Sequence, residues 1–211
     1  MRKQLGLFGG TFNPVHRYHV SMAEAFLTAF ALDHLLVIPA GLAYHKKEGN
    51  EVASATHRYQ MCQLAFSSLP KTSVSTTDLE RKGNTYTYDT LTILRHIYSE
   101  YQFLWLLGSD AFLQLNHWYR YQEVIMMTDF VVVVRPPAKK QDLFLFNQKL
   151  HPQANYYCLS LPACALSASS IRRSITQHCF DEKSVSLSVR DYIKAVSYTH
   201  LRAHETRHDL V

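Results

Sequence analysis

The stretch GGTFNPVHRYH, residues 9–19, directly follows the apolar run Leu5–Phe8 near the start of the chain. A short apolar run that ends at two glycines predicts a buried strand followed by a turn. The helix expected after Pro14 would present free N–H groups and a partial positive charge at its first turn. His16 and His19, three residues apart, would share one face of that helix. The stretch therefore predicts a site for a polyphosphate at the end of the first strand.

The parts of this stretch have separate physical uses. Gly9 and Gly10 would leave space for a phosphate, because glycine lets the backbone approach a ligand closely. Thr11 and Phe12 would supply backbone N–H groups. The two histidines would supply ring N–H donors, which can stabilise negative charge as phosphates rearrange. The alternative is a plain strand-to-helix turn followed by surface histidines.

Composition indicates an ordinary globular protein with a preference for anions. The 211 residues suffice for one domain with a full core, and 47% of them are hydrophobic. The net charge of +5 is dispersed, which favours small phosphates over nucleic acid. No apolar stretch reaches the roughly 20 residues of a membrane span, and the N-terminus lacks a signal-peptide pattern. We therefore expect a cytoplasmic protein without nucleic-acid or membrane partners, and we expect its four cysteines, which lack CxxC spacing, to be reduced.

Strand and helix patterns alternate along the chain. The strands lack polar alternation, which favours a parallel sheet covered on both faces, with ligands beyond the carboxyl ends of the strands. We therefore predict the α/β class: a Rossmann-like parallel sheet with helices on both faces, in a single domain over residues 1–196. The predicted strands are 5–8, 35–38, 74–79, 103–107, 130–134 and 156–161. The predicted helices include 20–32, 54–69, 88–98, 141–150, 169–177 and 186–195.

Residues 197–211 are polar and lack periodicity, so we interpret them as a non-native or disordered tail. This tail contains HETRH at 204–208, which matches the zinc-protease pattern HExxH. No long amphipathic helix carries the pattern and no third ligand follows it. We therefore predict no metal site there, and we expect deletion of the tail to leave folding and activity intact.

A second phosphate motif lies late in the chain, where residues 167–172 read SASSIR. Two hydroxyls followed by Arg172 at a helix start would hold a phosphate with side chains, N–H groups and a guanidinium. The alternative is a serine that only caps the helix.

The two motifs together resemble the signatures HxGH and ISxTxIR of a nucleotidyltransferase superfamily. The resemblance extends over nearly all of residues 4–195 to the bacterial nicotinate mononucleotide adenylyltransferases, in the order and spacing of that family. The segments that carry it are LERKGNTYTYDTL at 79–91, LLGSDAFLQLNHWYRYQEVI at 106–125, VVVVRPP at 131–137 and LSASSIRRSI at 166–175.

The resemblance implies a reaction of ATP with nicotinate mononucleotide that gives nicotinate adenine dinucleotide and pyrophosphate, a step of NAD biosynthesis. It implies Mg²⁺ bound through the phosphates of ATP and no covalent enzyme intermediate. The implied catalytic residues are His16, His19 and Arg172. The implied ATP-binding residues are Gly9, Gly10, Thr11, Phe12, Gly108, Asp110, Ser167, Ser169 and Ile171. The implied mononucleotide-binding residues are His45, Lys46, Thr85, Tyr86, Thr87, Trp118 and Arg135.

Three positions depart from the family pattern. Tyr18 stands where the signature has glycine, so its side chain is expected to crowd or shift the adenine. Ser169 stands for threonine and Asn13 for a frequent aspartate, which are mild changes. The sequence leaves open a related enzyme that uses nicotinamide mononucleotide, and a nucleotide-binding module that has lost catalysis through Tyr18. Phosphopantetheine as the acceptor is disfavoured by the segment with Trp118, and a homo-oligomer is left open.

Overall fold

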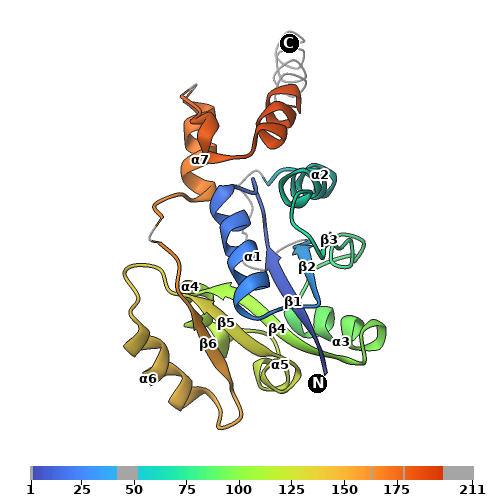
Figure 1. Ribbon diagram of the computed structural model, residues 1–211, viewed down its shortest axis with the longest axis vertical. Coiled ribbons are helices and arrows are strands. Elements are labelled where there is room, and N and C mark those ends of the chain that lie inside the picture. The colour runs from blue at the N-terminus through green and yellow to red at the C-terminus, as the bar shows by residue number, and fades with distance from the viewer. Residues whose placement is uncertain (1, 42–51, 163, 178, 197–211) are drawn as a thin grey trace, which may run out of the picture.

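The computed structural model describes residues 2–41, 52–162, 164–177 and 179–196 (Figure 1). In this part of the chain all sheet pairings are parallel, and the strand order is β3-β2-β1-β4-β5-β6. The strands are β1 (Lys3–Gly10), β2 (His34–Pro39), β3 (Thr72–Val74), β4 (Tyr101–Gly108), β5 (Asp129–Val133) and β6 (Tyr156–Leu159). The predicted parallel α/β architecture is therefore confirmed.

Helices connect successive strands, as parallel pairing requires. The α-helices are α1 (Arg17–Ala29), α2 (Ala55–Phe66), α3 (Thr87–Ile97), α4 (Ser109–Phe112), α5 (Tyr121–Met127), α6 (Lys140–Leu150) and α7 (Ala168–Thr176). Two 3₁₀ turns are η1 (Leu115–His117) and η2 (Glu182–Ser184), and residues 187–196 are helical. Ser54 caps α2, since its side chain accepts a hydrogen bond from the backbone N–H of His57 at 3.3 Å. In the described residues no helix is long and apolar enough to span a bilayer.

The prediction of a third strand over 74–79 is wrong. Strand β3 ends at Val74, because polar side chains take over the backbone hydrogen bonds beyond it. The Ser75 hydroxyl accepts from the backbone N–H of Thr77 at 3.1 Å, and a turn follows in which the N–H of Leu79 donates to the carbonyl of Thr76. Such local bonds compete with a strand ladder.

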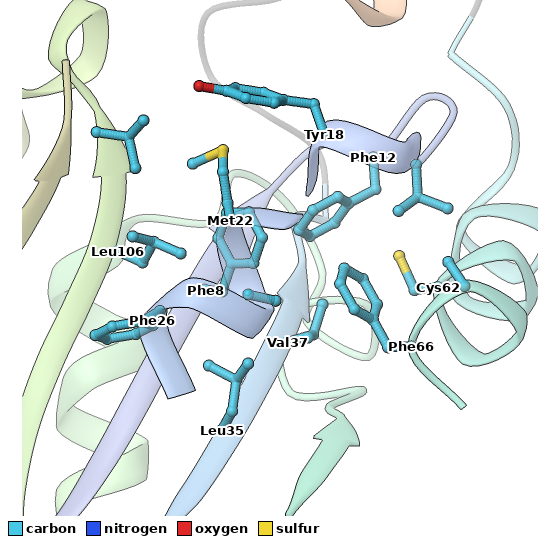
Figure 2. Close-up of a cluster of buried hydrophobic side chains, with 14 of the residues drawn as sticks. Phe8, Phe12, Tyr18, Met22, Phe26, Leu35, Val37, Cys62, Phe66 and Leu106 are labelled. Carbon is cyan, nitrogen blue, oxygen red and sulfur yellow. The ribbon is translucent and has the colours of Figure 1, made fainter. Parts of the chain in front are cut away.

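The sheet is buried on both faces by two separate clusters of apolar side chains. One cluster joins β1, β2, β4 and β5 to α1, α2 and α7, and Figure 2 shows part of it, with Phe8, Met22 and Phe66 among its members. The other cluster joins the same strands to α3, α5 and α6. On β4, Leu104 and Leu106 belong to the first cluster, whereas Phe103 and Trp105 belong to the second. This alternation explains why the strands read as continuous apolar runs.

The strand order places a topological switch point between β1 and β4. From β1 the chain continues to β2 and β3 on one side, and later returns to β4, β5 and β6 on the other. In open parallel sheets of this kind, ligands bind beyond the carboxyl ends of the strands at the switch point. The turn after β1, the turn after β4 and the end of β5 therefore meet where a ligand is expected.

Candidate active site

The turn between β1 and α1 is held from several sides. Phe12 adopts a left-handed backbone conformation with φ of 49°, and its buried ring packs edge-on against Phe8 at 5.3 Å between centroids. The carbonyl of Thr11 accepts from the Arg58 guanidinium at 3.0 Å. The side chain of Asn13 accepts from the backbone N–H of Ala53 at 3.2 Å. The turn is therefore a fixed scaffold for the residues that follow it.

His16 and His19 lie against each other at the start of α1, as the sequence predicts. Their rings stack with centroids 3.6 Å apart and an interplanar angle of 20°. The backbone N–H of His16 donates to Nδ1 of His19 at 3.2 Å. Because Nδ1 of His19 accepts this bond, the neutral ring carries its proton on Nε2. That tautomer leaves an N–H donor for a ligand.

Both imidazoles are held in the neutral form. Burial first, and then the positive charge of Arg135, lowers the pKa of His16 to about 4. Burial, the neighbouring His16 and Arg135 together lower the pKa of His19 well below its usual value. The histidines therefore act near pH 7 as hydrogen-bond donors rather than as cations. In the described structure Nδ1 of His16 is buried without a hydrogen-bond partner.

Arg135 reaches this pair from the end of β5. Its backbone N–H donates to the Ser109 hydroxyl at 2.9 Å, which fixes the main chain. Its guanidinium lies over the ring of Tyr18, 4.9 Å from the centroid, and Nη2 lies 3.2 Å from the sulfur of Met22. The positive charge of this guanidinium is near enough to lower the pKa of both histidines.

Arg172 on α7 contacts the first motif directly, although 159 residues separate the bonded positions. Its Nη1 donates to the carbonyl of Asn13 at 2.7 Å, and Nη2 donates to the Ser169 hydroxyl at 3.2 Å. Ser167 caps the helix, since its side chain accepts from the backbone N–H of Ser170 at 3.1 Å. The two motifs therefore lie in contact in the fold, and Ser167 also caps α7.

The turn after β4 brings an acidic side chain to the same edge. Asp110 is exposed, in the first turn of α4. A Cβ atom on Gly108 would lie 2.4 Å from the Asp110 carboxylate and 3.7 Å from a side-chain carbon of Arg135. Gly108 therefore has to be glycine for Asp110 to take this position.

The glycines of the first motif have a packing role that the sequence did not reveal. A Cβ on Gly9 would lie 2.7 Å from the indole of Trp105, and a Cβ on Gly10 would lie 3.0 Å from the ring of Phe12. The space that these glycines leave is thus filled by aromatic rings of the protein. Likewise, the predicted ATP ligand Ile171 has its side chain in the apolar core. Any contact of these residues with a nucleotide has to be made by the backbone.

Four of the predicted mononucleotide residues, Thr85, Tyr86, Thr87 and Trp118, come from two segments that meet at their tyrosines. The ring of Tyr86, just before α3, lies 4.6 Å from the ring of Tyr119. Trp118 is half-buried and packs at the border of the second apolar cluster. Thr85 and Thr87 flank Tyr86 and are also half-buried. The remaining two predicted residues, His45 and Lys46, lie outside the described residues.

Sequence reasoning missed Arg58, which is buried on α2. Besides Thr11, its guanidinium donates to the carbonyls of Ala40 at 2.6 Å and Ala53 at 3.0 Å. It therefore joins the ends of β1 and β2 to the start of α2. No local motif marks it, and an arginine in a weakly amphipathic helix is expected at the surface.

A buried acidic group that is hydrogen-bonded to α3 was also missed. The carboxylate of Asp78 accepts from the Thr90 hydroxyl at 2.6 Å and forms an ion pair with Arg81 at 3.3 Å. Burial raises the pKa of Asp78, and these two partners oppose that rise. The same Thr90 hydroxyl lies 3.1 Å from the carbonyl of Tyr86. Because the network links two segments, we assign it the role of fixing the start of α3.

The charges around the histidines are mostly positive. Neither Arg135 nor Arg172 forms an ion pair with a carboxylate in the described structure. The two neutral histidines add N–H donors to the site but no negative charge. Two guanidinium groups and a helix N-terminus at the carboxyl edge of the sheet favour a ligand with several negative charges.

Comparisons with known proteins identify the family of this chain. The cytidylyltransferase-like family model matches residues 7–174. A protein of Neisseria meningitidis named "probable nicotinate-nucleotide adenylyltransferase" is 33% identical over 206 residues, which cover 96% of this chain and 97% of that protein. A protein of Carboxydothermus hydrogenoformans with the same name is 36% identical, with 91% of this chain and 96% of that protein covered.

A solved structure shares the fold. The nicotinic acid mononucleotide adenylyltransferase of Plasmodium falciparum, complexed with APC, superimposes with a TM-score of 0.74 at 20% sequence identity. The match covers 92% of this chain and 96% of that chain. The resemblance drawn from the sequence is confirmed: the chain belongs to the cytidylyltransferase-like family, and within it to the nicotinate-nucleotide adenylyltransferases.

Proposed function

We propose that this protein transfers the adenylyl group of ATP to nicotinate mononucleotide, releasing pyrophosphate. The observation that carries the proposal is a convergence of four side chains at the carboxyl edge of the sheet. They come from segments far apart in the sequence and are His16, His19, Arg135 and Arg172. Segments around Tyr86 and Trp118 lie on the adjoining part of the fold and suit a second nucleotide.

The proposed chemistry needs no general base. The phosphate of the mononucleotide is already anionic, so its oxygen attacks the α-phosphorus of ATP. The bond from that phosphorus to the bridging oxygen breaks, and pyrophosphate leaves with the electron pair. Catalysis then consists of alignment and of stabilising the charge that develops. The neutral histidines fit this role, because they can donate N–H groups and the reaction transfers no proton to them.

The residues divide between the two substrates. We assign Thr11, Asp110, Ser167 and Ser169 to ATP, with backbone contacts from Gly9, Gly10, Phe12, Gly108 and Ile171. Arg135, His45 and Lys46 are assigned to the phosphate of the mononucleotide. Trp118 is assigned to stacking on the pyridine ring.

The segment from Thr85 to Thr87 leads into the first turn of α3. A helix N-terminus offers free N–H groups and a partial positive charge, which favour a carboxylate over an amide. This placement supports nicotinate over nicotinamide as the pyridine of the acceptor.

Mg²⁺ enters the proposal with the ATP substrate. Among the described residues, no group of three or more His, Cys, Asp or Glu side chains is placed to hold a metal ion. A magnesium ion that bridges phosphate oxygens keeps several waters and needs few protein ligands. When bound, it would neutralise charge on the departing pyrophosphate.

The test is pyrophosphate release from ATP and Mg²⁺ with either nicotinate or nicotinamide mononucleotide. Turnover with the nicotinate form is expected, and His19→Ala should lower kcat by about 10²- to 10³-fold, as removal of one charge-stabilising donor does. His34→Ala is the matched control, because His34 is also a half-buried histidine but bonds Ser73 away from the site. Equal rates with both mononucleotides would refute the acid preference alone. ATP binding without turnover would favour the binding-module alternative.

A further inference from the structure

Tyr18 lies between His16 and His19 in the sequence, and the proposed reaction does not use its side chain. Its side chain is 7% exposed and belongs to the apolar cluster of α1. Figure 2 shows its ring lying above Met22, at the edge of the part of the cluster that is drawn. The signature of the resembling family has glycine here, so this chain adds a whole aromatic ring next to its phosphate site.

The added ring contacts one charged group. The guanidinium carbon of Arg135 lies 4.9 Å from the Tyr18 centroid, within the range of a cation–π interaction. Met22 contacts the same guanidinium from α1. The Nε atom of Arg135 is buried without a hydrogen-bond partner in the described structure. The polar contacts of this guanidinium are therefore incomplete, and the aromatic ring and the sulfur fix its position.

We propose that Tyr18 is a positioning residue, whose ring holds the Arg135 guanidinium beside His16 and His19 so that the three side chains bind one phosphate group. The proposal rests on the proposed function for the identity of the substrate, but the anion site itself can be tested separately. It also revises the expectation that Tyr18 only crowds the adenine, because its ring is packed into the cluster and against Arg135.

The physical reason is the freedom of an arginine side chain. An unrestrained arginine loses much rotamer entropy when it binds an anion. A ring that already restricts the guanidinium removes part of that cost before the ligand arrives. The hydrogen bond to the Ser109 hydroxyl restricts only the main chain of Arg135. The ring of Tyr18 restricts its guanidinium.

The experiment is a double-mutant cycle with Tyr18→Leu and Arg135→Met, read out by calorimetric binding of inorganic pyrophosphate without ATP. Tyr18→Leu should weaken binding about 2- to 30-fold, the range of a cation–π contact. The same change in the Arg135→Met background should have little further effect. Tyr18→Phe should restore binding, because it keeps the ring.

A core control separates positioning from folding. Phe26→Leu alters the same helix and the same apolar cluster, away from Arg135. It should lower the melting temperature without changing pyrophosphate affinity. In turnover assays Tyr18→Leu should raise the KM for the mononucleotide, whose phosphate is assigned to Arg135, more than it lowers kcat.

The outcomes separate the two proposals. Wild-type protein that binds pyrophosphate but shows no turnover would contradict the proposed function, and the cycle would still decide the role of Tyr18. Unchanged affinity in Tyr18→Leu, additive effects of the two substitutions, or no pyrophosphate binding by wild-type protein would each overturn the positioning role.

Discussion

Acidification should destabilise this protein through His16, because burial holds its imidazole neutral. Its pKa is about 4 in the folded protein and 6.5 in the unfolded chain. Between these values the unfolded chain binds more protons, so the free energy of unfolding falls as the pH decreases from 6.5 and levels off below 4. From pH 7.5 to pH 5, His16 alone should lower it by about 2 kcal/mol. His19, whose pKa is also lowered, adds to the loss in the same direction.

The assay is urea denaturation at pH 7.5 and pH 5, with linear extrapolation of the free energy of unfolding to water. The comparison protein is His16→Asn, which cannot titrate there and keeps a good helix-capping residue before α1. The variant should lose about 2 kcal/mol less than wild type over this pH interval. The comparison cancels other titrating groups, such as His34 and Asp78. Equal losses in the two proteins would refute the argument that His16 is held neutral.

Three further predictions concern stability. Arg58→Met should lower the free energy of unfolding by about 3–5 kcal/mol, because three backbone carbonyls lose a charged donor, whereas Arg17→Met, with one such bond at the surface, should cost about 1 kcal/mol or less. Gly9→Ala should cost about 1–3 kcal/mol, because its Cβ would lie 2.7 Å from Trp105. Gly83→Ala should cost about 1 kcal/mol through its φ of 82° alone, since no atom lies near its Cβ position. Denaturant unfolding of each variant measures these changes, and a neutral Arg58→Met would contradict the role given to that residue.

The fold was predictable because burial on both faces makes the parallel strands readable as apolar runs. Strands β1, β2, β4 and β5 each contribute side chains to both clusters, so their sequences lack polar alternation. The segment 74–79 misled the prediction because Val74 and Leu79 enclose hydroxyl side chains that form local turns. The pattern of apolar residues in a sequence indicates which side chains are buried, but it does not show which hydrogen bonds the backbone forms.

The site was predictable where a motif is local, and it was not where tertiary contacts decide. The stacking of His16 on His19 follows from their spacing on one helix. The bonds of Arg58 to three carbonyls depend on where β1, β2 and α2 meet, and no sequence pattern marks such a meeting point. The contact of Tyr18 with Arg135 joins α1 to β5 and is equally invisible in the sequence.

The guanidinium of Arg172, which we propose to be catalytic, is partly committed to hydrogen bonds within the protein. A guanidinium has five N–H donors in a rigid plane. One donor of Arg172 binds the carbonyl of Asn13 and another binds the Ser169 hydroxyl, which leaves three donors in a fixed plane. The replacement of the usual threonine by Ser169 keeps the hydroxyl that this arrangement needs. Arg172→Lys retains the charge but cannot make both bonds in one plane, so it should lose phosphate affinity although the net charge is unchanged.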